Sequence, residues 1–402
     1  MNGRTTTVRA SARDDLTTRV DEVLPVLSAQ AAVTDASGEF PLVCLEALRA
    51  SGLMGLLVPG TYGGLGGDLR DVAAIAQRLA GECVSTAFVW AMHCQQVDAI
   101  ARFADESLRR RVLPRIAAEG RYLASVTAET STGGRLLRAD EALMPGPSGY
   151  GLARVAPVVT GGRHADGFLV KMRSAQDGAD TDVSLVYVDC ADAEVEITSP
   201  GWDALGMRGV ENVSLLLRAT VPVDHLVGGP NGFRRVVVEG FGVSAHVGWS
   251  ACWLGAARTA FSALLREVRA GRLRAVDPAS ELSRQRLASI RTRLEVVSAY
   301  LRCVVDEVTR RRGEGASLEL PAVQIHVNTL KVVAARETRA AVDEMVDLAG
   351  IRTGYLRGSG IPLERVLRDL RAASLTYDDM LLLVSNGSLS LLDPAVHGVG
   401  DW

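Results

Sequence analysis

Two changes in the spacing of apolar residues constrain the fold of this chain more than any other feature. Residues 13–121 have the helical period, with Leu45, Leu48 and Leu53 spaced to share one face. From residue 122, short β-rich stretches separated by Gly, Pro, Asp and Ser take over, at 122–127, 150–160, 167–172, 183–189, 194–198 and 213–218. After Pro230 the helical period returns and continues to about residue 392. The sequence therefore predicts helices, then strands, then helices.

This order predicts an α+β protein of several domains. We expect a helical N-terminal domain at 1–121, a small antiparallel barrel or sandwich at 122–229, and a helical C-terminal domain at 230–402. Within the first domain a long helix is predicted to begin after Asp68, whose carboxylate suits a helix N-cap. The Gly-rich stretch at 59–67 separates that helix from the one before it.

Charge and composition exclude several classes of function. The 44 basic and 47 acidic residues give a net charge of −3 and are spread along the chain, so neither nucleic acid nor a membrane surface is an expected partner. No apolar run approaches the roughly 20 residues that a membrane span needs. The six cysteines are scattered without a paired motif, which favours a cytoplasmic protein with reduced thiols. The histidines show no metal-ligand spacing, so no metal site is predicted.

A series of short motifs runs through the whole chain in a consistent order. They are Leu57-Val58-Pro59 leading to Tyr62–Gly67, Ser85–Ala87 with Ala91–His93, Arg109–Pro114, Ala124–Glu129 followed by Gly133-Gly134, Gly206–Gly209, and Pro362–Arg365 with Arg368-Asp369. Each is weak alone, but together they resemble the acyl-CoA dehydrogenase family. The resemblance implies that family's fold, with a C-terminal four-helix bundle, and bound FAD. It also implies a homodimer or homotetramer and an acyl-CoA or carrier-protein-bound substrate.

The stretch after the first predicted strand is the expected flavin contact. Reduction places negative charge on the pyrimidine edge of a flavin, where hydroxyl and backbone N–H donors stabilise it. Thr127 with its neighbour Val126 suits that role, and Thr160 lies near the position of a second flavin-facing strand. Gly133 and Gly134 allow close backbone approach to the flavin or to a thioester substrate. The alternative for all of these residues is ordinary strand and turn chemistry.

The resemblance also implies a site for the pyrophosphate and adenine side of FAD. Arg272 lies about where the family has a phosphate-binding arginine, and a loop containing Gly350 and Gly354 is the one that the family borrows from a neighbouring subunit. The local sequence differs from that of the family, in which an aromatic residue and a glycine usually follow the arginine, because Leu273 follows it here. A solvated helix end is the alternative for Arg272.

The base that the family uses to remove the α-proton is missing. Its glutamate usually follows the Arg-Asp pair by about eight residues, a place that falls on Tyr377 here, and some members use a position that corresponds to Ala245 or His246. Asp378 is one candidate base, and Tyr377 or His246 in another proton transfer is a second. A third possibility is a reaction without α-proton abstraction. Asp378 and Asp379 also suit a simple helix-capping role.

Two tryptophans accompany His246 on one predicted helix. Trp249 and Trp253 are four residues apart, so both could line a substrate pocket beside His246, although core packing is the commoner explanation for such a pair.

Three functional hypotheses follow. The first is an FAD-dependent acyl-thioester α,β-dehydrogenase of a bacterial biosynthetic pathway. The second is a flavin-dependent monooxygenase on the same fold, which uses reduced flavin and oxygen to oxygenate carbon or nitrogen. The third is a flavin-free scaffold or non-redox enzyme.

Overall fold

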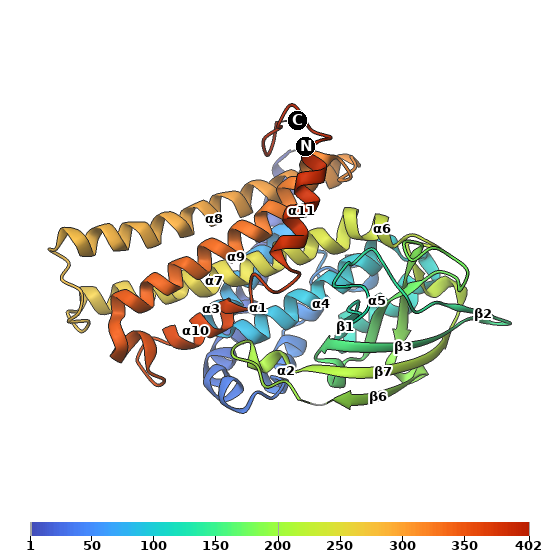
Figure 1. Ribbon diagram of the computed structural model, residues 1–402, viewed down its shortest axis with the longest axis horizontal. Helices are drawn as coiled ribbons and strands as arrows, with labels where there is room; N and C mark the ends of the chain where they lie inside the picture. Colours follow the sequence, from blue (N-terminus) through green and yellow to red (C-terminus); the bar gives the residue numbers. More distant parts are fainter. Residues whose placement is uncertain (1, 200, 402) are drawn as a thin grey trace.

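The computed structural model describes residues 2–199 and 201–401. Its first part is helical, as predicted, and Figure 1 shows it in blue to blue-green. The helices of this part are α1 (Asn2–Ser37), α2 (Leu42–Ala50), α3 (Leu69–Glu82), α4 (Val84–Phe103) and α5 (Glu106–Glu119). The predicted cap of α3 is confirmed: Asp68 accepts hydrogen bonds from the backbone of Arg70 and Asp71, and the Asp71 carboxylate accepts one in return from the backbone of Asp68.

The middle part consists of two four-stranded sheets. One contains β1 (Leu123–Val126), β4 (Gly167–Arg173), β5 (Val183–Asp189) and β8 (Leu226–Val227), in that order. The other has the order β2 (Met144–Gly146), β3 (Gly149–Thr160), β7 (Asn212–Val221) and β6 (Ala193–Ser199). The pairs are antiparallel except β1 and β4, which run parallel.

The last part is helical again. A short helix α6 (Phe233–Val236) and a π-helical turn (Val237–Phe241) lead into α7 (Gly242–Arg269), which is followed by α8 (Glu281–Glu314), α9 (Pro321–Gly350), α10 (Leu363–Arg371) and α11 (Asp379–Ser390). In Figure 1, α7, α8 and α9 lie side by side, and α3 and α4 pack against α7. The fold predicted from the resemblance is confirmed, whereas the exact domain limits at 121 and 229 stay a prediction.

Close packing joins the two helical parts. Gly255 of α7 lies so near the backbone of Gln77 in α3 that an added Cβ would stand 2.2 Å from the Gln77 carbonyl oxygen. The helices α3, α4 and α7 thus form a closely packed part of a core that continues into the sheets and into α8 and α9, and one end of α7 extends towards the sheets.

A buried histidine ties the first strand to the helices. The Nδ1 atom of His93 in α4 accepts a hydrogen bond from the backbone N–H of Leu123, and its Nε2–H donates to the carbonyl of Met54. Burial lowers the pKa of His93 to about 4, so the ring is neutral and can accept at Nδ1. This contact fixes β1, and with it the segment that follows β1, relative to α4.

Within the described residues, no helix is long and apolar enough to cross a membrane.

Candidate functional site

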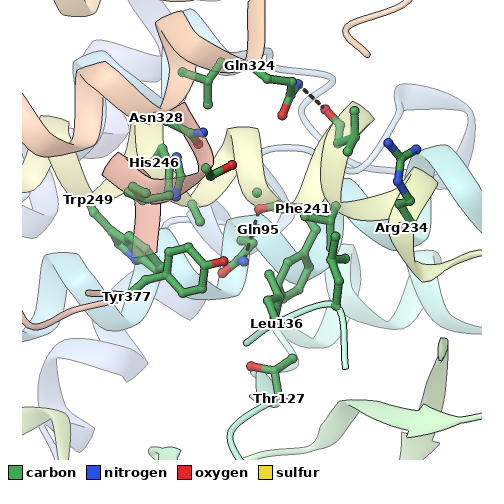
Figure 2. A pocket seen from close by; sticks show the side chains of 18 of the residues that line it. Gln95, Thr127, Leu136, Arg234, Phe241, His246, Trp249, Gln324, Asn328 and Tyr377 are labelled. Carbon is green, nitrogen blue, oxygen red and sulfur yellow. Dashed lines mark hydrogen bonds between the residues drawn. The ribbon is translucent and has the colours of Figure 1, made fainter. Parts of the chain in front are cut away.

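A cavity of about 280 Å³ lies where α4, the segment after β1, α7, α9 and the end of the chain meet (Figure 2). This is near the lower end of the volumes of small-molecule sites, about 300–1,000 Å³. Its walls combine apolar side chains with a few polar groups, among them Met92, Gln95, Ser125, Thr127, Leu136, Phe241, His246, Trp249, Asn328 and Tyr377. Several polar groups are held rigidly: the Gln95 amide donates to the carbonyl of Phe241, and the Asn328 amide donates to Asn386.

His246 lies at the centre of the cavity wall. Its ring centroid is 5.8 Å from that of Trp249 and 6.1 Å from that of Tyr377. The pKa of His246 is lowered to about 3, chiefly by burial and also by the nearby charge of Lys331, while a hydrogen bond to the backbone of Val327 opposes both effects. The imidazole is therefore neutral near pH 7.

Tyr377 enters the cavity from the segment between α10 and α11. Its backbone has a positive φ of 46°, a left-handed conformation that is rare for a residue other than glycine. The backbone carbonyl accepts a hydrogen bond of 3.0 Å from the buried ammonium of Lys331. Burial raises the pKa of the Tyr377 phenol, so the hydroxyl keeps its proton at neutral pH.

Two buried polar atoms on the wall lack a hydrogen-bond partner among the described residues. They are Nδ1 of His246 and the indole Nε1 of Trp249. A buried donor or acceptor left without a partner costs about 1–3 kcal/mol. This favours a ligand that brings both a hydrogen-bond donor and an acceptor to this wall.

Glu319 is the only carboxylate among the residues that line this cavity in the described part of the chain. Its side chain is 50% exposed and forms an ion pair with Arg234, also a lining residue. Asp378 does not line the cavity: it is exposed and caps α11 by accepting a 2.9 Å hydrogen bond from the backbone N–H of Met380. Asp379 is buried and pairs with Lys331 at 2.7 Å. The interior of the cavity thus has polar groups but no carboxylate base.

The structure brings some of the predicted flavin residues to the cavity and leaves others outside it. Thr127 lines the wall, with its hydroxyl 3.4 Å from that of Ser125. Val126 is buried within β1, and the Thr160 hydroxyl donates to Asn212 instead of facing the cavity. Gly133 and Gly134 follow Thr127 in turns with positive φ, which glycine adopts without strain.

Three residues predicted for the phosphate side of FAD, and one predicted for the substrate, lie away from the cavity lining. Arg272 is exposed in the turn after α7, and its Nε and Nη2 atoms donate to Glu267 at 2.7 and 2.6 Å. Gly350 ends α9, and Gly354 packs against the backbone of Val346. Trp253 is 1% exposed and lies in the core, 5.7 Å from the ammonium of Lys331.

Sequence reasoning missed the polar residues contributed by α4 and α9. Gln95 and Asn328 line the cavity, and Lys331 lies behind it, but each stands in an apolar helical stretch without a motif. The one signal that points to Lys331 is the scarcity of lysine, since only Lys171 and Lys331 occur among 44 basic residues.

Comparison with known proteins assigns the family. Residues 7–120 match the acyl-CoA dehydrogenase N-terminal domain, and residues 247–376 match the acyl-CoA dehydrogenase C-terminal domain. The chain belongs to the acyl-CoA dehydrogenase family. It is accordingly a flavin-dependent oxidoreductase.

Among similar proteins are two with a different reaction in their names. L-evernosamine nitrososynthase of a Micromonospora species is 28% identical over 390 residues, which cover 92% of this chain and 88% of that protein. The amino sugar nitrososynthase RubN8 of Streptomyces rubradiris is also 28% identical and covers 97% of this chain and 93% of its own length. The solved structure of KijD3, in complex with FMN and dTDP-3-amino-2,3,6-trideoxy-4-keto-3-methyl-D-glucose, has a TM-score of 0.79 and 25% identity, covering 97% and 95% of the two chains.

The two positions at which the sequence resemblance led us to expect the base both lie on the wall of this cavity. One is Ala245 with His246, and the other is Tyr377. Both places are therefore on the cavity wall, but neither carries a carboxylate.

Proposed function

We propose that this protein is a flavin-dependent monooxygenase that oxygenates the nitrogen of an amino sugar. The observation that carries the proposal is the absence of a carboxylate from the cavity interior in the described part of the chain, at the two positions where dehydrogenases of this family carry their base. Removal of an α-proton from an acyl thioester needs a general base with a pKa near the working pH. An oxygenation by reduced flavin does not need that base.

The groups that occupy the two positions are poor replacements for a carboxylate. His246 has a pKa of about 3 and is a weak proton acceptor. The pKa of Tyr377 is raised by burial, so its hydroxyl is protonated and acts as a hydrogen-bond donor. Both side chains are suited to orient a polar, neutral substrate group rather than to remove a carbon-bound proton.

The cavity has features that fit a flavin ring. The hydroxyls of Ser125, in β1, and Thr127, just after β1, lie together on the cavity wall. These are donors of the kind that a reduced flavin ring requires. When bound, the flavin would store two electrons and activate oxygen. Apolar side chains such as Phe241 and Leu136 would keep water away from that reaction.

Two considerations favour nitrogen of an amino sugar as the site of oxygenation. The two nitrososynthases resemble this chain over nearly its full length, and KijD3 holds an amino sugar nucleotide on the same fold. The wall also offers both an unpaired acceptor and an unpaired donor, Nδ1 of His246 and Nε1 of Trp249, which match an amine next to a carbonyl or hydroxyl group. The balanced reaction converts the amine, oxygen and reduced flavin to hydroxylamine, water and oxidised flavin.

The proposal favours FMN over FAD as the flavin. Arg272 lies in the exposed turn after α7 and binds Glu267 through Nε and Nη2, so binding of a diphosphate there would have to compete with this ion pair. KijD3 holds FMN.

An anaerobic experiment separates oxygenation from dehydrogenation. The flavin-loaded protein is mixed without oxygen with butyryl-CoA, and in a second cell with the sugar nucleotide that KijD3 binds. We expect neither to bleach the oxidised flavin. With oxygen and a flavin reductase present, the sugar nucleotide should be converted to a hydroxylamine. Bleaching by butyryl-CoA would overturn the proposal in favour of the dehydrogenase.

A further inference from the structure

The only two lysines of the chain occupy equivalent settings at the cavity. All other side-chain cations among the 44 basic residues are arginines. Lys171 of β4 and Lys331 of α9 are both completely buried, each with 0% exposure. Each ammonium contacts one buried carboxylate and one backbone carbonyl. The partners of Lys171 lie in the segment after β1, and those of Lys331 lie just before α11 and at its first residue.

Lys331 anchors the segment before α11. Its ammonium donates at 3.0 Å to the carbonyl of Tyr377 and at 2.7 Å to the carboxylate of Asp379. The two contacts span the residue that caps α11, so they fix the backbone of Tyr377 in its left-handed conformation. The Tyr377 ring lines the cavity, and its direction follows from this backbone conformation.

Lys171 anchors the segment after β1. Its ammonium donates at 2.5 Å to the carbonyl of Arg138 and forms an ion pair of 3.1 Å with Glu129. Glu129 lies near the start of the segment and Arg138 near its end, and Leu136 between them lines the cavity with Leu137. Glu129 also pairs with the fully buried Arg154 of β3, whose guanidinium donates to the Ala128 carbonyl.

The segment after β1 lies close to the first turn of α11. A Cβ added to Gly134 would lie 3.5 Å from the Leu381 Cδ1 atom, the distance of an ordinary van der Waals contact. Leu382, the next residue, lines the cavity. The segment that Lys171 anchors therefore lies near the start of α11, where Lys331 binds Asp379.

We propose that Lys171 and Lys331 are positioning residues that together hold these two segments in the arrangement that closes the cavity. A lysine suits this role because its compact ammonium can donate to a carboxylate and a carbonyl at once in a buried space. Burying an ammonium costs several kcal/mol unless a carboxylate and further hydrogen bonds compensate. Both sites provide that compensation. Each also holds a segment whose side chain, Leu136 or Tyr377, lines the cavity.

The first test uses proteolysis and needs no substrate, so its outcome does not depend on the proposed function. Only the expected effect of the two lysines on turnover rests on the proposed function. Lys171→Met is examined with trypsin, which cleaves after the exposed Arg138. Lys331→Met combined with Asp379→Leu, which removes both buried charges, is examined with chymotrypsin, which cleaves after Tyr377. Removing both charges avoids the large loss of stability that follows when one buried charge is left unpaired.

We expect each variant to be cleaved at least about tenfold faster at its own segment, and at the wild-type rate at the other segment, since local opening has its own free energy. Each variant is thus the control for the other. An equal acceleration at both segments would mean general destabilisation and would overturn the inference, as would wild-type rates throughout.

The second test separates positioning from a structural role. With the sugar nucleotide of KijD3 as substrate, the Lys331→Met/Asp379→Leu variant should lose kcat/KM by up to about 100-fold, because small displacements of positioning groups have effects of that size. In a Tyr377→Ala background the same pair of changes should have an effect of about twofold or less, because Lys331 acts through Tyr377. Equal losses in both backgrounds would contradict that route of action.

Discussion

The imidazole of His246 and the phenol ring of Tyr377 face the same cavity with their centroids 6.1 Å apart. One comes from α7 and the other from the segment before α11, more than 130 residues further along the chain. These are the two positions at which the sequence resemblance led us to expect a catalytic carboxylate. Their meeting here, as two neutral groups, underlies the proposal that the cavity oxygenates its substrate instead of dehydrogenating it.

Replacement of Asp378 tests its role as a helix cap. The carboxylate accepts from the Met380 backbone and is exposed, so Asp378→Asn should keep both the cap and the turnover, the latter within about twofold. Asp378→Ala should lower the free energy of unfolding by about 1 kcal/mol, measured by urea denaturation. A loss of turnover of about 100-fold or more in Asp378→Asn would instead identify this residue as the base.

Replacement of Thr127 and Arg272 distinguishes the two expected ends of the flavin site. Thr127→Val keeps the shape of the side chain but removes a hydroxyl from the cavity wall, so the dissociation constant of FMN should rise about fivefold, the effect of one hydrogen bond of about 1 kcal/mol. Arg272→Ala serves as the comparison, and FMN should bind it as it binds the wild type, because Arg272 is bound to Glu267. Fluorescence titration measures both. Weaker FMN binding in Arg272→Ala alone would reverse the assignment.

A buried aspartate should make stability depend on pH. Burial raises the pKa of Asp369 from 3.8 to about 7, and its hydrogen bond from the Met207 backbone opposes this rise. Between these two values the folded protein holds a proton that the unfolded chain has released, so this contribution to stability is lost as pH rises towards 7, by up to about 1.4 kcal/mol per pH unit.

Asp369→Asn removes that dependence while keeping an acceptor for the Met207 N–H. The melting temperature of the variant relative to the wild type should therefore be higher at pH 8 than at pH 5. The buried histidines His93 and His246 titrate in both proteins and cancel in this difference. A difference that does not change with pH would show that Asp369 is ionised in the folded protein at pH 5.

The regular elements were predictable from the sequence because their patterns are local. The alternation in 150–160 predicts β3 almost to the residue, and Asp68 marks the start of α3 through a cap formed within four residues. β2 was missed because its three residues are all exposed and show no alternation. The parallel pairing of β1 with β4 could not be read from β1, which is short and almost entirely buried.

The site was predictable only where a motif marked it. The Arg368-Asp369 pair gave the register that leads to Tyr377, and the structure places Tyr377 on the cavity wall. Tyr377 lines the cavity, whereas the next residue, Asp378, lies outside its lining and caps α11. The left-handed backbone at Tyr377 sets these different directions, and it could not be read from the sequence. The contact of Lys331 with the Tyr377 carbonyl joins residues 46 positions apart and leaves no local pattern in the sequence.

Isotope labelling of the product tests the central claim most directly. The protein is loaded with FMN, supplied with reduced flavin and the sugar nucleotide of KijD3, and run under ¹⁸O₂, and the product is analysed by mass spectrometry. Our account predicts a hydroxylamine or a further oxidised nitrogen that carries one ¹⁸O atom from oxygen. A product without ¹⁸O, together with an α,β-unsaturated thioester when butyryl-CoA is supplied, would contradict it.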